Sequence, residues 1–203
     1  KNIVTGEGGM VTTNDESIEK ELRIRSLHGI DKDAWKRFSD SGYSSYETIY
    51  PGYKYNMMDI QASMGLHQLK KVEKFLETRI KIWNMYNEAF SQIDELIIPI
   101  EQDNIVHARH LYNLLIRPEK LSITRDDFIT ELFKRRIGSG IHYTSVHFHK
   151  YYKDKYGYKE NDFPVAKWYS ERTISLPLSP KLNNADIIDV INAVKDIIVK
   201  YKI

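Results

Sequence analysis

The order of apolar and polar residues predicts a chain built mainly from amphipathic helices. In several stretches the apolar residues recur at spacings of three or four, which places them on one face of a helix. The helices expected to end at residue 69 and to begin at residue 72 form one long segment that is bent near residues 70–73. The helices expected from this spacing cover residues 16–27, 56 or 59 to 69, 72–90, 124–136, 162–173 and 184–198.

Short extended segments lie between these helices, mostly in the second half of the chain. β-branched and aromatic residues bounded by turn residues predict strands over residues 10–13, 96–100, 111–116, 140–145 and 174–178. Their alternation with helices after about residue 75 predicts a compact α/β or α+β domain. Residues 1–75 contain too few strands for a sheet of their own. We therefore divide the chain into residues 1–75, the end of a larger domain, and residues 76–203, a small α/β domain.

Composition and charge exclude several classes of protein. Apolar residues make up 41% of the chain and charged residues 29%, as in ordinary globular proteins. The net charge of +2 gives no reason to expect a nucleic-acid partner. No apolar run reaches the roughly 18 residues of a membrane span, and no secretory signal is visible, so we expect a cytoplasmic protein. The absence of cysteine excludes disulfides, thiolate metal sites and a cysteine nucleophile.

Lys1 is the first candidate for chemistry, because it precedes the glycine-rich turn Gly6-Glu7-Gly8-Gly9. Glycine lets the backbone turn tightly or approach a ligand closely. A lysine beside such a turn can bind phosphate or form a Schiff base with a carbonyl group. A surface lysine next to an ordinary turn explains the same residues, so spacing alone leaves both interpretations open.

The other candidates are Asn56, His142 and Tyr143. Asn56 lies where an aromatic-rich loop meets a predicted helix, where it could bind a phosphate or simply cap the helix. His142 and Tyr143, at a predicted strand, could face a polar ligand or be ordinary surface residues. His147 and His149 lie close to His142, but this spacing is not a helical zinc-ligand pattern, and we predict no metal site.

A series of motifs, taken together and in order, resembles one family. The motifs are Lys1–Thr13, Leu27-His28-Gly29, Asp33–Arg37, Pro51–Ala62, Gly65-Leu66, Gln68-Leu69, His110-Leu111-Tyr112, Gly138 with Ile141-His142-Tyr143, and Ser175–Leu178. They resemble the DegT/DnrJ/EryC1/StrS sugar aminotransferases, which are fold-type I enzymes that use pyridoxal phosphate (PLP). The resemblance covers essentially the whole chain, and several motifs in order are more specific than any one of them.

This resemblance implies an α/β fold, the C-terminal part of a fold-type I PLP-dependent aminotransferase. Lys1 is implied to be the catalytic lysine, which bonds the cofactor as a Schiff base and moves protons. Asn56 is implied to reach the cofactor phosphate of the partner subunit, in a homodimer with shared active sites. His142 and Tyr143 are implied to border the substrate pocket. The aromatic loop over residues 30–50 is implied to close over the substrate.

The implied reaction transfers an amino group from glutamate to a keto-sugar nucleotide. Analogy with relatives favours a 4-keto sugar used for surface polysaccharides or glycolipids. Two alternatives stay open: a PLP-dependent sugar dehydratase, and a non-catalytic binding or assembly module that retains the fold. Dehydratase relatives usually replace the cofactor lysine by histidine, so Lys1 argues against the first.

The chain begins with Lys1 rather than methionine, and we interpret it as a C-terminal fragment. In the family, roughly as much chain again precedes the lysine. That segment supplies the acidic partner of the pyridine nitrogen, the residue that stacks on the ring and most phosphate ligands. We therefore expect the 203-residue chain alone to bind PLP poorly and to be inactive. Arg109 replaces an aromatic residue found in many relatives.

Overall fold

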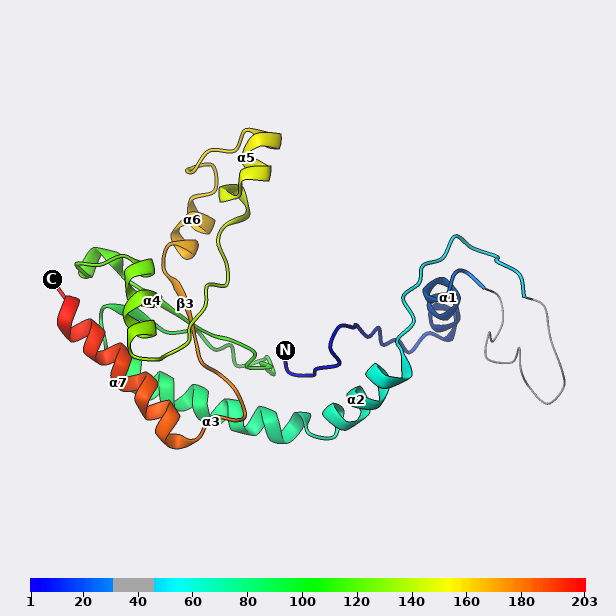
Figure 1. The fold of residues 1–203 in the computed structure, drawn as a ribbon, viewed down its shortest axis with the longest axis horizontal. Helices are drawn as coiled ribbons and strands as arrows, with labels where there is room; N and C mark the ends of the chain where they lie inside the picture. Colours follow the sequence, from blue (N-terminus) through cyan, green and yellow to red (C-terminus); the bar gives the residue numbers. More distant parts are fainter. Residues whose placement is uncertain (31–45) are drawn as a thin grey trace. The chain divides into compact units, whose positions relative to one another are not determined.

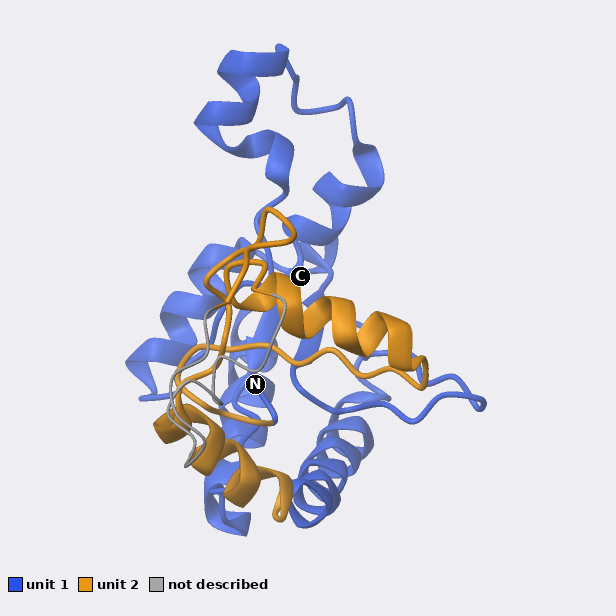
Figure 2. Ribbon diagram, turned by 90° about the vertical axis from the view of Figure 1, so that its right-hand side faces the viewer, with its two compact units in different colours: residues 1–2, 72–203 blue, residues 3–71 orange. Residues whose placement is uncertain are grey.

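The computed structural model describes residues 1–30 and 46–203, which form two compact units. The sheet unit consists of residues 1–2 and 72–203, and the loop unit of residues 3–71 (Figure 2). Each unit is described by itself. The Asp33–Arg37 motif, and most of the loop expected to close over a substrate, lie outside the described residues.

The sheet unit is built on three antiparallel strands in the order β1-β2-β3. The strands are β1 (Leu96–Ile97), β2 (Tyr112–Ile116) and β3 (Thr173–Leu176). Every residue of β3 is buried, as are all residues of β2 except one. This burial explains why β2 ends in the continuous apolar run Leu114-Leu115-Ile116. Beyond β3, a single bridge from Gly140 to Ser175 extends the sheet by one residue.

Three long helices complete the core of the sheet unit: α3 (Val72–Phe90), α4 (Arg125–Lys134) and α7 (Asn184–Tyr201). Helix α7 packs against both α3 and α4 (Figure 1). Burying one large apolar side chain contributes about 1.5–3 kcal/mol. The helical residues buried most completely include Trp83, Tyr86, Phe90, Phe128, Leu132, Ile187 and Ile197.

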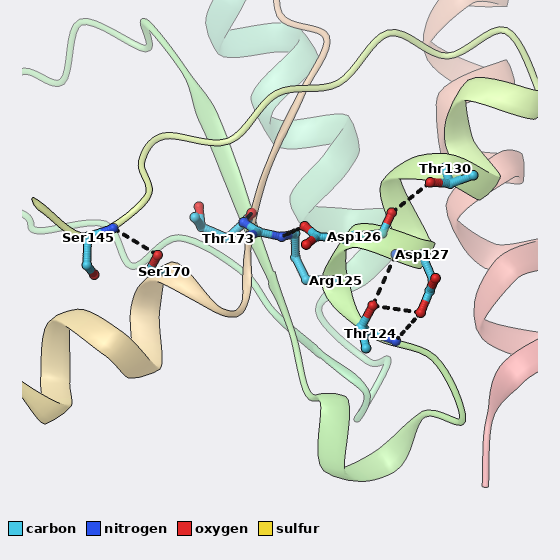
Figure 3. Close-up of polar contacts among 8 residues, drawn as sticks. All are labelled: Thr124, Arg125, Asp126, Asp127, Thr130, Ser145, Ser170 and Thr173. Carbon is cyan, nitrogen blue, oxygen red and sulfur yellow. Dashed lines mark hydrogen bonds and ion pairs between the residues drawn. The ribbon is translucent and has the colours of Figure 1, made fainter. Parts of the chain in front are cut away.

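Local polar contacts determine where two of these helices begin. Thr124 and Asp127 form a capping box, with the Thr124 N–H donating to Asp127 Oδ2 at 3.0 Å (Figure 3). Asn183 caps α7 together with Asp186. Such caps satisfy backbone N–H groups that the first turn of a helix leaves unpaired.

Three short helices form an arm within the sheet unit: η3 (Val146–Phe148), α5 (Lys150–Tyr156) and α6 (Pro164–Ser170). Figure 1 shows α5 and α6 standing away from the strands. Ser145 closes the base of the arm. Its N–H donates to Ser170 Oγ at 3.0 Å (Figure 3), and its hydroxyl donates to the Ala166 carbonyl at 2.6 Å. A further short helix, η2 (Pro118–Lys120), lies between β2 and α4.

The loop unit contains two helices, α1 (Glu16–Ser26) and α2 (Asp59–Leu69), and neither has a buried residue. Isolated bridges join Leu27 to Lys54 and Ile30 to Thr48. Gly29 has a φ of +72°, and a Cβ there would lie 1.8 Å from the Tyr50 carbonyl oxygen. Only glycine therefore allows the two backbone segments to approach this closely.

The helical predictions are confirmed within a few residues, and the strand predictions only in part. The break between α2 and α3 falls at Lys70 and Lys71, inside the region predicted to bend. Residues 10–13 form no strand, and residues 140–145 contribute only the bridge at Gly140, so both of those strand predictions are wrong. Helix α5 was not expected. Among the described helices, none is both long enough and apolar enough to cross a membrane.

Candidate active site

Lys1 is exposed, and its amine has no hydrogen-bond or ion-pair partner among the described residues. Its neighbour Asn2 donates a hydrogen bond from Nδ2 to the carbonyl of Ala108. This contact fastens the start of the chain to the segment that leads into β2. The chain therefore begins beside that segment, and the Lys1 side chain is exposed there.

Arg79, on α3, donates hydrogen bonds to the same segment. Its Nη1 donates to the carbonyls of Arg109 and His110, both at 3.2 Å, and of Leu178 at 3.0 Å. The Arg79 side chain is almost fully buried. One guanidinium therefore ties the residues before β2 to those that follow β3. Sequence reasoning missed this role, because an arginine in a helix carries no local sign of its tertiary partners.

His110 lies among positive charges. Burial lowers its pKa, and the positive charges of the chain's α-amine, Arg79 and Lys1 lower it further. A pKa below the ordinary value favours the neutral imidazole of His110.

Arg109 is occupied by structural contacts. Its guanidinium lies 4.5 Å from the centre of the Trp83 ring, and Nη2 is 2.8 Å from Glu101 Oε2. A cation over an aromatic face is stabilised by the quadrupole of the ring. The Arg109 guanidinium is therefore packed against Trp83 and paired with Glu101.

His142 and Tyr143 follow the Gly140 bridge. His142 Nδ1 is 2.6 Å from Ser175 Oγ, and the Ser175 hydroxyl donates to Asn113 Oδ1 at 2.6 Å. The Tyr143 side chain is 70% exposed, and its ring centre lies 4.6 Å from that of His142. The pair offers one imidazole held by the sheet and one phenol open to solvent, a combination suited to a polar ligand.

Asn56 lies in the loop unit and is exposed. It does not cap α2: the N-cap residue is Met58, whose N–H donates to Gln61 Oε1 at 3.2 Å. The prediction that Asn56 serves as a simple helix cap is therefore wrong. No hydrogen bond joins its side-chain amide to another described residue, so the amide can bond to a ligand.

His147, which lies close to His142 in the sequence, packs inside the arm. His147 is buried in the arm, where Nε2 lies 3.2 Å from the Glu160 carbonyl and its ring contacts Phe148 and Phe163. In the part of the chain that the structure describes, no three His, Cys, Asp or Glu side chains are grouped to hold a metal ion.

Comparison with known proteins places this geometry in a family. Residues 1–195 match the model of the DegT/DnrJ/EryC1/StrS aminotransferase family, and the chain belongs to that family. It is 52% identical over 198 residues to the uncharacterized protein MJ1066 of Methanocaldococcus jannaschii. It is 48% identical over 199 residues to the spore coat polysaccharide biosynthesis protein SpsC of Bacillus subtilis. Each match covers 98% of this chain and 51% of the relative.

Solved structures agree with this assignment. Spr1654 of Streptococcus pneumoniae, a provisionally assigned sugar aminotransferase solved in its PMP form, superposes with a TM-score of 0.83 at 31% identity. The match covers 98% of this chain and 51% of Spr1654. PseC of Helicobacter pylori shares the fold with the same TM-score at 24% identity. The predicted fold, an α/β C-terminal part of a fold-type I aminotransferase, is confirmed, and the chain spans about half the length of these relatives.

Proposed function

We propose that this chain is the lysine-bearing half of an enzyme that uses PLP to move an amino group from glutamate to a keto-sugar nucleotide. The observation that carries the proposal is the family match, which includes Lys1, together with the unpartnered amine that the structure shows there. The name of SpsC supports a product used in polysaccharide biosynthesis. We further propose a 4-keto sugar as acceptor and the cytoplasm as location.

The residues present fit a cofactor that carries an aldehyde and a phosphate. PLP, when bound, supplies an electrophilic aldehyde and a ring that withdraws electrons. Lys1 provides an amine that no carboxylate pairs with among the described residues. That amine can bond the aldehyde and can move a proton at the carbon that gives up or receives nitrogen. The exposed amide of Asn56 suits a phosphate oxygen, and we propose that it serves the partner subunit of a homodimer.

His142 and Tyr143 are proposed to contact the substrate. The imidazole is held by Ser175, so its position is determined before a ligand arrives. The exposed phenol can donate to or accept from a sugar hydroxyl. Preorganised polar groups of this kind discriminate between ligands because they lose no further freedom on binding.

Amination by the protein at the full length of its relatives tests the proposal. The assay offers glutamate and a panel of 4-keto and 3-keto sugar nucleotides, and measures the amino-sugar product. Lys1→Arg keeps the charge but removes the reactive amine, and we expect activity to fall by at least about 10²-fold. Lys20→Arg, at an exposed position on α1, is the matched control and should retain activity. Binding of a sugar nucleotide without amination would instead support a non-catalytic module.

The 203-residue chain alone is proposed to bind PLP poorly. Helix α2 exposes apolar side chains that a folded enzyme would cover, among them Ile60 at 73% and Leu66 at 65%. We expect that addition of PLP to this chain produces no strong absorbance band of a lysine Schiff base. A strong band that Lys1→Arg abolishes would refute this expectation.

A further inference from the structure

Three neighbouring segments of the sheet unit place one row of residues side by side: Asn113, Ser175 and Gly140. The register of β2 and β3 sets Ser175 opposite Asn113, and Gly140 bridges to the other edge of Ser175. The Ser175 N–H donates to the Gly140 carbonyl at 2.8 Å, and the Gly140 N–H donates to the Ser175 carbonyl at 3.1 Å. Because both backbone groups of Ser175 face Gly140, Ser175 and Asn113 form a non-hydrogen-bonded antiparallel pair, in which side chains lie closest.

Gly140 also makes room for the ring of His142. A Cβ at position 140 would lie 3.2 Å from His142 Cε1 and 3.7 Å from Nδ1. The imidazole therefore folds over a residue that has no side chain, and Nδ1 reaches Ser175 Oγ at 2.6 Å. The Ser175 hydroxyl in turn lies 2.6 Å from Asn113 Oδ1. The result is a continuous line of polar groups from Asn113 through Ser175 to His142.

This line determines which ring nitrogen of His142 carries the proton. A serine hydroxyl has one hydrogen, and here it is donated to Asn113 Oδ1. Only lone pairs of Ser175 Oγ then face His142, so Nδ1 must carry a hydrogen and donate it. In a neutral imidazole the other nitrogen, Nε2, is then a bare acceptor. Nε2 has no hydrogen-bond partner among the described residues.

We propose that Asn113 and Ser175 are positioning residues that hold neutral His142 as the Nδ1–H tautomer, so that Nε2 accepts a hydrogen bond from a substrate hydroxyl. The second half of this proposal rests on the proposed function, whereas the tautomer is a property of the chain itself. The opposite tautomer would present an N–H group and would select an acceptor instead. The row therefore decides which kind of sugar substituent His142 prefers.

The tautomer is tested by nuclear magnetic resonance on the 203-residue chain labelled with ¹⁵N-histidine, at a pH where the imidazoles are neutral. Long-range proton–nitrogen couplings show which ring nitrogen is protonated, and the variant His142→Gln identifies the signals of His142. We expect a single Nδ1–H form. Asn113→Leu frees the Ser175 hydroxyl to donate to Nδ1, so this variant should switch His142 to the Nε2–H form. The exposed His149 is the internal control, and its tautomer should not change.

Two results would overturn the tautomer assignment. One is an Nε2–H form, or a mixture of forms, in the unsubstituted chain. The other is a tautomer of His142 that does not respond to Asn113→Leu while the amide signals of β2 and β3 show an intact sheet. Ser175→Ala provides a second variant: it should leave His142 with a mixture of tautomers, and a pure Nδ1–H form in Ser175→Ala would also contradict the assignment.

Kinetics of the full-length enzyme test whether His142 Nε2 accepts a hydrogen bond from the substrate, which is the second half of the proposal. Asn113→Leu should raise the KM for the keto-sugar nucleotide about 2- to 10-fold, the range expected for one hydrogen bond, and leave the KM for glutamate unchanged. An active enzyme in which Asn113→Leu leaves the sugar-nucleotide KM unchanged would refute the second half of the proposal. An unsubstituted enzyme that aminates no sugar nucleotide would refute the proposed function, while the tautomer result would stand.

Discussion

Replacement of Arg79 by leucine is expected to destabilise the sheet unit by about 1–5 kcal/mol. Nη1 of Arg79 contacts three carbonyls, but it carries only two hydrogens, so it can make two bonds at full strength. Each bond from a charged donor contributes about 1.5–3 kcal/mol, which together is roughly 3–6 kcal/mol. A buried leucine side chain recovers about 1–2 kcal/mol of this through apolar burial. The difference gives the expected loss.

Urea unfolding followed by circular dichroism measures this loss directly. Lys195→Leu, at an exposed position on α7, is the control and should change stability by no more than about 0.5 kcal/mol. Arg79→Leu should also raise the pKa of His110, because it removes a neighbouring positive charge. Burial should still hold the pKa of His110 below its ordinary value. Equal stability of the Arg79→Leu and Lys195→Leu variants would refute the view that Arg79 ties these segments together.

Three further predictions concern the sheet unit. Hydrogen bonds from Lys134 and Arg135 lower the pKa of Glu131 to about 2. The stabilising contribution of this carboxylate should therefore be complete above about pH 4.5 and lost as the pH falls towards 2. Urea titrations of Glu131→Gln should lack this part of the acid dependence. Leu132→Ala should cost about 2–5 kcal/mol in urea unfolding, because the side chain is fully buried, and a cost below about 1 kcal/mol would contradict the described core. Asn183→Ala removes the cap of α7 and should lower stability by about 0.5–2 kcal/mol in the same assay, whereas no loss would show that the cap is dispensable.

The helices could be predicted from the sequence because their signals are local. The apolar spacing of residues 72–90 reflects one buried face, and α3 occupies that same range. Thr124 and Asp127 bond to groups within one turn, so their spacing was sufficient to place the start of α4. The family motifs are likewise short, ordered strings, and together they identified the fold.

The strand predictions failed where pairing depends on distant residues. Residues 10–13 have strand-like composition, but no described segment pairs with them in a ladder. Residues 140–145 leave the sheet after Gly140 and pass into the arm, whose base Ser145 closes by contacts with α6. Strand propensity reports a side chain that suits a half-buried surface, and it does not report whether a partner strand lies beside it.

The sequence by itself determined the helices, the family and the candidate lysine, because each is written in residues that are neighbours along the chain. Only the tertiary structure decided that Arg79 ties together the segments before β2 and after β3. It also decided that Asn113, Ser175 and His142 form one hydrogen-bonded line, although long stretches of sequence separate them. The physical reason is that a sheet register and a buried side chain bring distant residues to within about 3 Å, the range in which a hydrogen bond acts.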